Sequence, residues 1–371
     1  MARTEKTRIR YAVVGLGYIA QIAVLPAFAH ARRNSELRAL VSGDRVKRDR
    51  LGRQYRVPST YDYAEFDRCL ASGDIDAVYI ALPNDMHRAY AEAAARAGVH
   101  VLCEKPLAVT ASDCRAMIDT AKEHRVKLMT AYRLHFDPAN LGAIDIVQSG
   151  KLGKVRLFNS VFGMQVKAGN IRLKDERGGG PLYDIGIYCI NASRYLFRDE
   201  PVECYAVAAN NGDARFNEVE ESVTAVLRFP GERVATFTCS FGSADVSAYE
   251  VVGTAGVLRV DPAYDFADAL THRLKVNGRE REKTFPQHDQ FAPLLLHFSD
   301  CVIRNREPEP SGLEGLRDVR IIEALHESIA KGSPVKIDAL PAADRRPDRK
   351  QEIRVKAVQR PKLVRAVTPT R

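Results

Sequence analysis

The sequence lacks the features that mark several specialised classes of protein. Its 371 residues contain no apolar run of about 18 residues or more, so we expect no membrane-spanning helix. The seven cysteines never form a CxxC pair and the nine histidines show no ligand spacing, so neither a disulfide framework nor a metal site is expected. No Walker loop, nucleophile elbow or internal repeat is present. P-loop and serine-hydrolase chemistry are therefore not indicated.

The cysteines and the N-terminus indicate a reducing compartment. Several cysteines lie in apolar runs, which is typical of buried free thiols. Residues 1–8 lead directly into a strand-like segment, which leaves no room for an export signal. We therefore expect a cytoplasmic protein.

Excess positive charge is confined to the two ends of the chain. The net charge is +9, which by itself suggests a nucleic-acid or anionic partner. Residues 341–371 carry ten basic and three acidic side chains, and residues 1–10 carry four basic and one acidic. The net charge of residues 11–340 is therefore −1, so we predict no nucleic-acid partner. The basic extension is expected to be disordered or to pack at a subunit edge.

Two hydrophobic periodicities divide the chain. Residues 1–132 alternate short apolar strands with helices, which predicts a parallel sheet covered on both faces. Residues 133–340 contain strands at hairpin-like spacing and two closing helices near 290–305 and 312–330. The predicted fold is thus α/β: an N-terminal Rossmann doubly wound parallel sheet, a C-terminal α+β domain with a large, mostly antiparallel, open-faced sheet, and a basic extension at 341–371.

The first motif is a GxGxxA sequence at the end of the first predicted strand. Gly15 allows a tight turn, and Gly17 lets the backbone approach a pyrophosphate at the N-terminus of the following helix. A strand before the motif and a helix after it favour dinucleotide binding over a simple backbone turn.

The residues after the second strand indicate which dinucleotide is bound. NAD sites usually place an acidic residue there, on the ribose 2′-hydroxyl. Here Ser42 and Gly43 come first, and Asp44 is followed by Arg45, Lys47 and Arg48. A hydroxyl and cations suit a 2′-phosphate, so NADP is predicted in preference to NAD. A solvated helix start would carry the same residues.

Two further motifs supply candidate chemistry. Glu104-Lys105-Pro106 follows a strand at the edge where open α/β sheets bind ligands, although a surface loop could hold the same tripeptide. Gly178–Gly180 lead into an expected helix on which Asp184, Tyr188 and Asn191 share one face. A carboxylate, a phenol and an amide on one face fit a sugar-binding pocket; the alternative is a core helix with a polar edge.

These motifs, in this order, resemble the Gfo/Idh/MocA oxidoreductase family, within it the glucose–fructose oxidoreductase branch. The resemblance covers about residues 8–335 and includes IDAVYIALPNDMH (75–87), CEKPLAVTASDCRAMID (103–119) and GGGPLYDIGIYCINASRYLF (178–197). It implies NADP-dependent oxidation of an aldose at C1 to a lactone, and a homodimer or homotetramer formed through the C-terminal sheet.

The resemblance also implies roles for individual residues. Tyr188 is the acid/base, Lys105 lies by the nicotinamide and stabilises the phenolate, and Asp184 orients substrate hydroxyls. A free tyrosine has a pKa of about 10, so such a cation is needed for base catalysis near neutral pH. Arg133 could touch substrate, although a hinge role is an alternative, and His87 could simply cap a helix. The implied cofactor-binding residues are Gly15, Leu16, Gly17, Tyr18, Ile19, Ser42, Gly43, Lys47, Leu82, Asn84, His87, Glu104, Lys105 and Arg133; those for substrate are Lys105, Arg133, Asp184 and Tyr188.

One departure leaves the reaction cycle open. Members that retain their cofactor carry a long N-terminal arm over the adenine, whereas about seven residues precede the first strand here. A dehydrogenase with exchangeable NADP is therefore preferred, with a retained-cofactor enzyme that oxidises one sugar and reduces another as the alternative. A catalytically silent NADP-binding regulator is a third reading.

Overall fold

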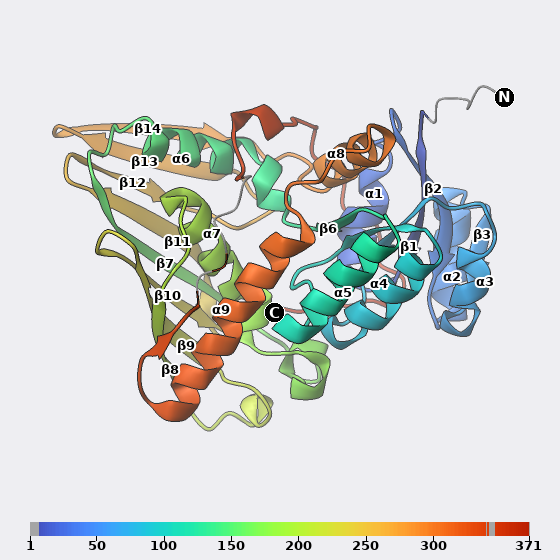
Figure 1. Ribbon diagram of the computed structural model, residues 1–371, viewed down its shortest axis with the longest axis horizontal. Coiled ribbons are helices and arrows are strands. Elements are labelled where there is room, and N and C mark those ends of the chain that lie inside the picture. Colours follow the sequence, from blue (N-terminus) through green and yellow to red (C-terminus); the bar gives the residue numbers. More distant parts are fainter. Residues whose placement is uncertain (1–6, 339, 341–345, 371) are drawn as a thin grey trace.

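The computed structural model describes residues 7–338, 340 and 346–370, and it contains two sheets with helices between and around them (Figure 1). The six-stranded sheet lies in the N-terminal half, and the nine-stranded sheet lies on the far side of the molecule. Helices α6 (Pro138–Gln148), α7 (Ile187–Phe197) and α9 (Gly312–Lys331) lie between the two sheets. This arrangement confirms the predicted fold class.

The N-terminal sheet is parallel throughout, in the order β3-β2-β1-β4-β5-β6. Strand order reverses between β1 and β4, and in doubly wound sheets the cofactor crevice lies at the carboxyl ends of the strands on either side of such a reversal. The strands are β1 (Ile9–Val14), β2 (Ser35–Val41), β3 (Ser59–Tyr61), β4 (Ala77–Ile80), β5 (His100–Cys103) and β6 (Leu128–Thr130). The main helices around them are α2 (Arg45–Tyr55), α3 (Phe66–Leu70), α4 (His87–Arg96) and α5 (Ala111–Glu123).

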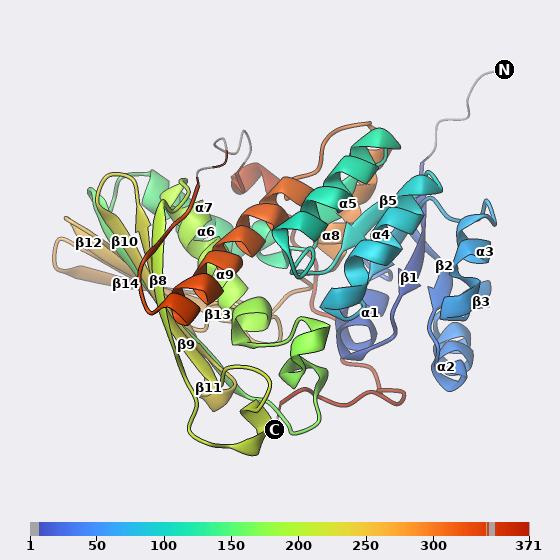
Figure 2. The ribbon, with the colours of Figure 1, turned by 60° about the horizontal axis from the view of Figure 1, so that its bottom comes forward.

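The C-terminal sheet is antiparallel except for one parallel pair, β7 with β10. Its order is β14-β13-β12-β11-β7-β10-β9-β8-β15. The strands are β7 (Val155–Gln165), β8 (Glu203–Ala209), β9 (Ser222–Phe229), β10 (Arg233–Ser240), β11 (Gly242–Gly253), β12 (Gly256–Val260), β13 (Leu270–Val276), β14 (Arg279–Phe285) and β15 (Val335–Lys336). Helices cover one face, and the other face points away from the molecule (Figure 2).

One strand of this sheet carries little hydrophobic signal in the sequence. β14 reads REREKTF, and six of its seven residues are exposed, because it is an edge strand. β13 pairs with it in a hairpin. A strand without alternating apolar residues is not detected by periodicity, so the sequence does not indicate β14.

The chain returns to the N-terminal domain after the second sheet. Helix α8 (Ala292–Ile303) packs against β1 and β2, and its leucines join the same core cluster as Tyr11 and Leu40. Residues 346–370 also pack on their own chain, with Val364 buried in that cluster. Along its described residues the extension therefore packs on its own chain and does not form the disordered tail that was one of the two expectations, because apolar side chains within the basic sequence join this core.

The seven cysteines are buried and unpaired. No helix of the described residues is long and apolar enough to cross a bilayer. Within the same residues, no cluster of three or more His, Cys, Asp or Glu side chains has the arrangement of a metal site.

Candidate active site

Lys105 lies directly after β5, at the carboxyl edge of the parallel sheet, and reaches into the C-terminal domain. Its Nζ donates hydrogen bonds to the main-chain oxygen of Asp184 at 2.6 Å and to Asp184 Oδ1 at 3.1 Å. The side chains of Lys105 and Asp184 are 12% and 18% exposed, so both are largely withdrawn from water. Burial lowers the pKa of Lys105, but the negative charge of Asp184 and the neighbouring Tyr188 and Glu104 outweigh it, and the pKa is raised. Lys105 is therefore a permanent cation.

Tyr188 lies between two cations. Its ring centroid is 4.9 Å from Lys105 Nζ and 5.0 Å from the guanidinium carbon of Arg133. Arg133 Nε donates to the Tyr188 hydroxyl at 3.3 Å. Arg133 is itself buried, and its other nitrogens donate to the side chain of Gln290 and the carbonyl of Tyr264. These hydrogen bonds hold the Arg133 guanidinium in position as a positively charged donor to the Tyr188 hydroxyl.

Arg172 completes the cluster and was missed by the sequence analysis. Its Nε donates to Asp184 Oδ2 at 2.6 Å, opposite the oxygen that accepts from Lys105. Burial raises the pKa of Asp184, but the Arg172 and Lys105 cations outweigh it and hold the pKa well below its usual value. Arg172 precedes the glycine run in a short 3₁₀ segment with no motif of its own, so no sequence pattern could have indicated it.

The expected single polar face on the helix after the glycine run is only partly observed. Residues Leu182–Gly186 form a π-helical turn before α7 begins at Ile187, so the spacing of about 3.6 residues per turn does not hold there. Asp184 and Tyr188 share Lys105. Asn191 instead accepts from His135 Nε2 at 2.8 Å and donates to Asp318 at 2.9 Å in a separate buried network. His135 belongs to that network and not to the Tyr188 cluster.

Glu104 and His87 fix the loops around Lys105. The Tyr79 hydroxyl donates to Glu104 Oε1 at 2.7 Å, and burial raises the pKa of Glu104. His87 is fully buried, and its two ring nitrogens face the carbonyls of Pro106 (2.9 Å) and Leu82 (3.0 Å). His87 therefore joins the loop after β4 to the loop after β5, and burial lowers its pKa.

The GxGxxA turn has the geometry that a pyrophosphate requires. Gly15 has a φ of +94°, and a Cβ there would lie 2.5 Å from the Ala81 carbonyl oxygen. At Gly17 a Cβ would meet nothing within 4 Å, so the backbone faces open space at the N-terminal end of the following helical turn. A close-packed first glycine and an open second one fit a dinucleotide phosphate at this position.

The end of β2 fits the ribose end of such a cofactor. Asp44 caps α2, and its side chain accepts from the backbone N–H of Lys47 at 3.2 Å, which places Lys47 on the first helical turn. Ser42 Oγ accepts from the Asp44 backbone N–H at 3.3 Å, and Arg48 donates to the Ser42 carbonyl. Asp44 is thus engaged as a cap, with a hydroxyl and a cation beside it.

The remaining predicted residues lie along the same edge. Asn84 donates to the Gly178 carbonyl at 2.8 Å and so connects the two domains beside the crevice. Gly43 is exposed next to the Tyr63 ring. The others are apolar: Leu16 and Leu82 are buried, and Tyr18 and Ile19 are half-buried.

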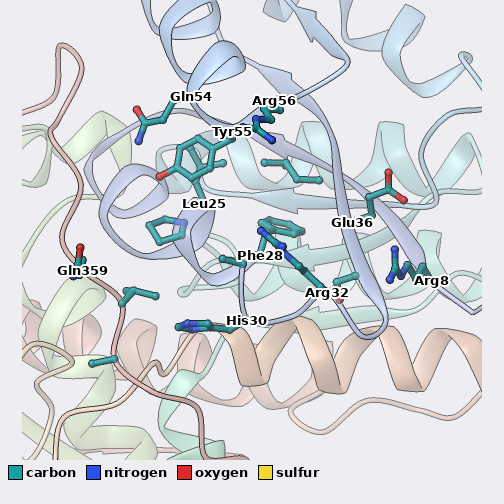
Figure 3. A pocket seen from close by; sticks show the side chains of 16 residues that line it. Arg8, Leu25, Phe28, His30, Arg32, Glu36, Gln54, Tyr55, Arg56 and Gln359 are labelled. Carbon is teal, nitrogen blue, oxygen red and sulfur yellow. The ribbon is translucent and has the colours of Figure 1, made fainter.

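A cavity of about 1040 Å³ lies elsewhere (Figure 3). Phe28, His30 and Tyr55 line it together with Gln359, and it also touches the start of β2. Within the described chain, none of the residues predicted to bind cofactor or substrate lines this cavity. Open α/β sheets bind ligands at the carboxyl ends of their strands, whereas this cavity lies at an amino-terminal end, so the site is assigned to the Lys105 edge.

A Rossmann sheet with an open glycine turn, joined to a domain that presents a lysine-bound carboxylate and a tyrosine, defines a nicotinamide-dependent oxidoreductase. The family profile described as "Oxidoreductase family, NAD-binding Rossmann fold" matches residues 9–132, and that of the "GFO/IDH/MocA C-terminal domain" matches residues 141–259. The chain belongs to the Gfo/Idh/MocA oxidoreductase family, as the sequence motifs predicted.

Individual relatives agree with this assignment. A D-xylose 1-dehydrogenase [NADP(+)] of Haloarcula marismortui is 32% identical over 89% of this chain and 93% of its own length. The crystal structure of an aldose-aldose oxidoreductase from Caulobacter crescentus, complexed with glycerol, has a TM-score of 0.85 and 39% identity, over 89% of this chain and 99% of that one. A 3-ketoreductase from Actinomadura kijaniata, in complex with NADP and TDP-benzene, has a TM-score of 0.79 and 27% identity, over 86% and 98% of the two chains.

Proposed function

We propose that this protein is an NADP-dependent sugar oxidoreductase that oxidises an aldose at C1 to the lactone. The observation that carries the proposal is the position of Tyr188, against both Lys105 and Arg133, with the same Lys105 ion-paired to the Asp184 carboxylate. A base, fixed cations and a hydrogen-bond acceptor at one edge of a dinucleotide-binding sheet suit removal of a proton from a sugar hydroxyl group and of a hydride from the carbon that carries it. Similarity to the xylose dehydrogenase and the aldose-aldose oxidoreductase supports a sugar substrate.

NADP fits the residues that are present. The backbone around Gly15 and Gly17 would hold the pyrophosphate, and Ser42 and Lys47 would hold the 2′-phosphate. When bound, NADP supplies the nicotinamide ring that accepts hydride.

The protein's own residues manage the proton and the substrate position. Tyr188 Oη takes the proton of the C1 hydroxyl, and Arg133 and Lys105 stabilise the resulting phenolate. Each oxygen of Asp184 accepts one bond, from Lys105 or from Arg172, and keeps a lone pair for a sugar hydroxyl. The low pKa of Asp184 keeps it ionised, so it acts as an acceptor throughout the working pH range.

A second candidate is exchange between two sugars on a cofactor that is not released. The 39% identity to the aldose-aldose oxidoreductase favours it. In that cycle Tyr188 returns its proton when a second aldose is reduced, and no net nucleotide reduction is observed.

The open face of the nine-stranded sheet is the proposed subunit contact. Leu157 on β7, Tyr205 and Val207 on β8 and Val246 on β11 are exposed large apolar residues of this sheet. A broad exposed face of this kind is typical of an interface between copies, so we expect a homodimer or homotetramer.

The test of function is nucleotide reduction with a panel of aldoses. Added NADP and a substrate aldose should raise the absorbance of reduced nicotinamide, whereas retained-cofactor exchange should give sugar products without that change. Mass spectrometry of nucleotide released from denatured protein distinguishes the two cycles. If NADP binds but no aldose or aldose pair reacts, the catalytic proposal fails and a silent NADP-binding regulator remains.

A further inference from the structure

The C-terminal segment contacts both domains, at residues close to the proposed cofactor site. Residues 363–370, which we call the strap, lie outside the two family-profile matches. In Figure 2 the red C-terminal segment passes beneath the short helix α1 (Leu25–Ala27) and continues toward the C-terminal domain. The strap is therefore placed to act on a cofactor bound between the domains.

One end of the strap is attached directly to the dinucleotide-binding turn. The backbone N–H of Val364 donates to Gln21 Oε1 at 2.7 Å, and Gln21 Nε2 donates to the Val364 carbonyl at 2.9 Å. Gln21 is buried in the helical turn after the GxGxxA motif, and its Nε2 also donates to the Leu16 carbonyl of that motif at 2.9 Å. Val364 is 8% exposed and packs into the core below, and Leu363 packs against the same core. Two hydrogen bonds and two packed apolar side chains therefore hold this end of the strap on the Rossmann domain.

The next residue brings a cation to the ribose end of the crevice. Arg365 Nη1 lies 3.5 Å from Asp44 Oδ1, beside Ser42 and Lys47. The Arg365 side chain is 62% exposed, so the guanidinium nitrogens that do not face Asp44 can reach a phosphate. Its φ of +46° turns the chain away from the Rossmann domain at this point.

The other end of the strap is attached to the C-terminal domain. The Lys167 backbone N–H donates to the Pro369 carbonyl at 2.9 Å, and Lys167 Nζ donates to Thr368 Oγ1 at 2.7 Å. Thr368 is three residue steps after Arg365, a span of at most about 11 Å for extended chain. Lys167 follows β7, the strand whose Phe162 contacts the Tyr188 ring at 5.7 Å. The strap thus joins the ribose-binding edge to the domain that carries Tyr188.

We infer that the strap is a clasp that retains NADP, with Arg365 as an additional ligand of the 2′-phosphate. The inference rests on the proposed NADP-dependent function and extends it to a residue outside the Rossmann motifs. A cofactor beneath the strap cannot leave until the Val364–Gln21 or the Lys167 contacts open, so its dissociation is slowed. Arg365 adds selectivity, because its guanidinium meets a phosphate in NADP and only a hydroxyl in NAD.

The test measures nucleotide binding on the full chain and on strap variants. Arg365→Ala and a chain shortened after Lys362 are compared with wild type, and Lys362→Ala is the control because it removes one exposed positive charge from the same segment. Dissociation of NADPH is followed by the loss of its fluorescence when excess NADP is added, and equilibrium titrations give Kd for NADPH and NADH.

The clasp predicts different results for the variants. Shortening should accelerate NADPH dissociation about tenfold or more, and Arg365→Ala should raise Kd for NADPH roughly three- to tenfold while Kd for NADH stays within twofold. Lys362→Ala should match wild type. Unchanged NADPH dissociation in every variant would overturn the clasp. Tighter NADPH binding by the shortened chain would also overturn it, because the strap would then be competing with the nucleotide for the site. If the shortened chain does not fold, the test rests on Arg365→Ala and on the ratio of its Kd for NADPH to its Kd for NADH. Failure of wild type itself to bind either nucleotide would refute the proposed function.

Discussion

Replacing Tyr188 with phenylalanine isolates the proposed proton transfer, because the substitution removes one oxygen and leaves the ring. That ring contacts Phe162 at 5.7 Å and Tyr264 at 5.9 Å, and Lys105 and Arg133 lie over it at 4.9 and 5.0 Å. Phenylalanine preserves all four contacts. The variant should therefore fold and bind NADP like wild type, and it should lose turnover.

The expected magnitudes separate catalysis from stability. Among the described residues, the hydrogen bond that the substitution removes is the 3.3 Å bond from Arg133, which is worth about 0.5–1.5 kcal/mol to folding. General acid–base catalysis contributes roughly 10²- to 10⁴-fold in rate, or about 2.7–5.4 kcal/mol at about 1.36 kcal/mol per decade. The loss of activity should thus be far larger than any loss of stability explains.

The assay is the initial rate of nucleotide reduction at saturating aldose, with NADPH affinity measured by fluorescence. Tyr183→Phe is the matched control: Tyr183 lies on the same helical segment, but its hydroxyl donates to the Val109 carbonyl at 2.9 Å, away from Lys105. That control should keep most of its activity. A Tyr188→Phe enzyme with more than a tenth of wild-type turnover, or equal losses in both variants, would refute the acid/base role.

Three further results are expected. Lys47→Ala should raise Kd for NADPH about three- to tenfold and leave that for NADH nearly unchanged, because only a 2′-phosphate pairs with the ammonium; parallel fluorescence titrations check this, and equal effects would contradict it. Asp184 has a lowered pKa, so its charge stabilises the fold above its usual pKa of 3.8 and this contribution disappears as pH falls through the lowered value. The difference in Tm between wild type and Asp184→Asn should therefore be constant from about pH 7 to 5 and shrink below about pH 4; a difference that widens in acid would be inconsistent. Val207→Arg on the open sheet face should convert the oligomer to monomer by light scattering, and an unchanged mass would remove that face as the interface.

The sequence was most informative where structure depends on neighbours along the chain. The alternation of strand and helix over residues 1–132 predicted the parallel sheet, and the family resemblance is confirmed by both profile matches. Helix α2 begins at Arg45, because Asp44 directly before it is a local cap. The turn at Gly15 and Gly17 was predictable for the same reason: its chemistry is contained in six consecutive residues.

Tertiary structure decided what depends on residues far apart in the chain. Lys105 meets Asp184 across 79 positions, and Arg133 meets Gln290 across 157. The strap meets Gln21 across 343 positions, and nothing in its basic, aperiodic sequence indicates where it binds.

The excess positive charge of the chain shows this division most clearly. Composition established that the charge lies at the ends and that the body is neutral. Only the fold showed that one of those terminal cations, Arg365, lies beside Asp44, where we propose that the cofactor ribose binds. The physical reason is that a strand or turn is specified by local backbone preference, whereas this position results from burial of Val364 in a core assembled from distant segments.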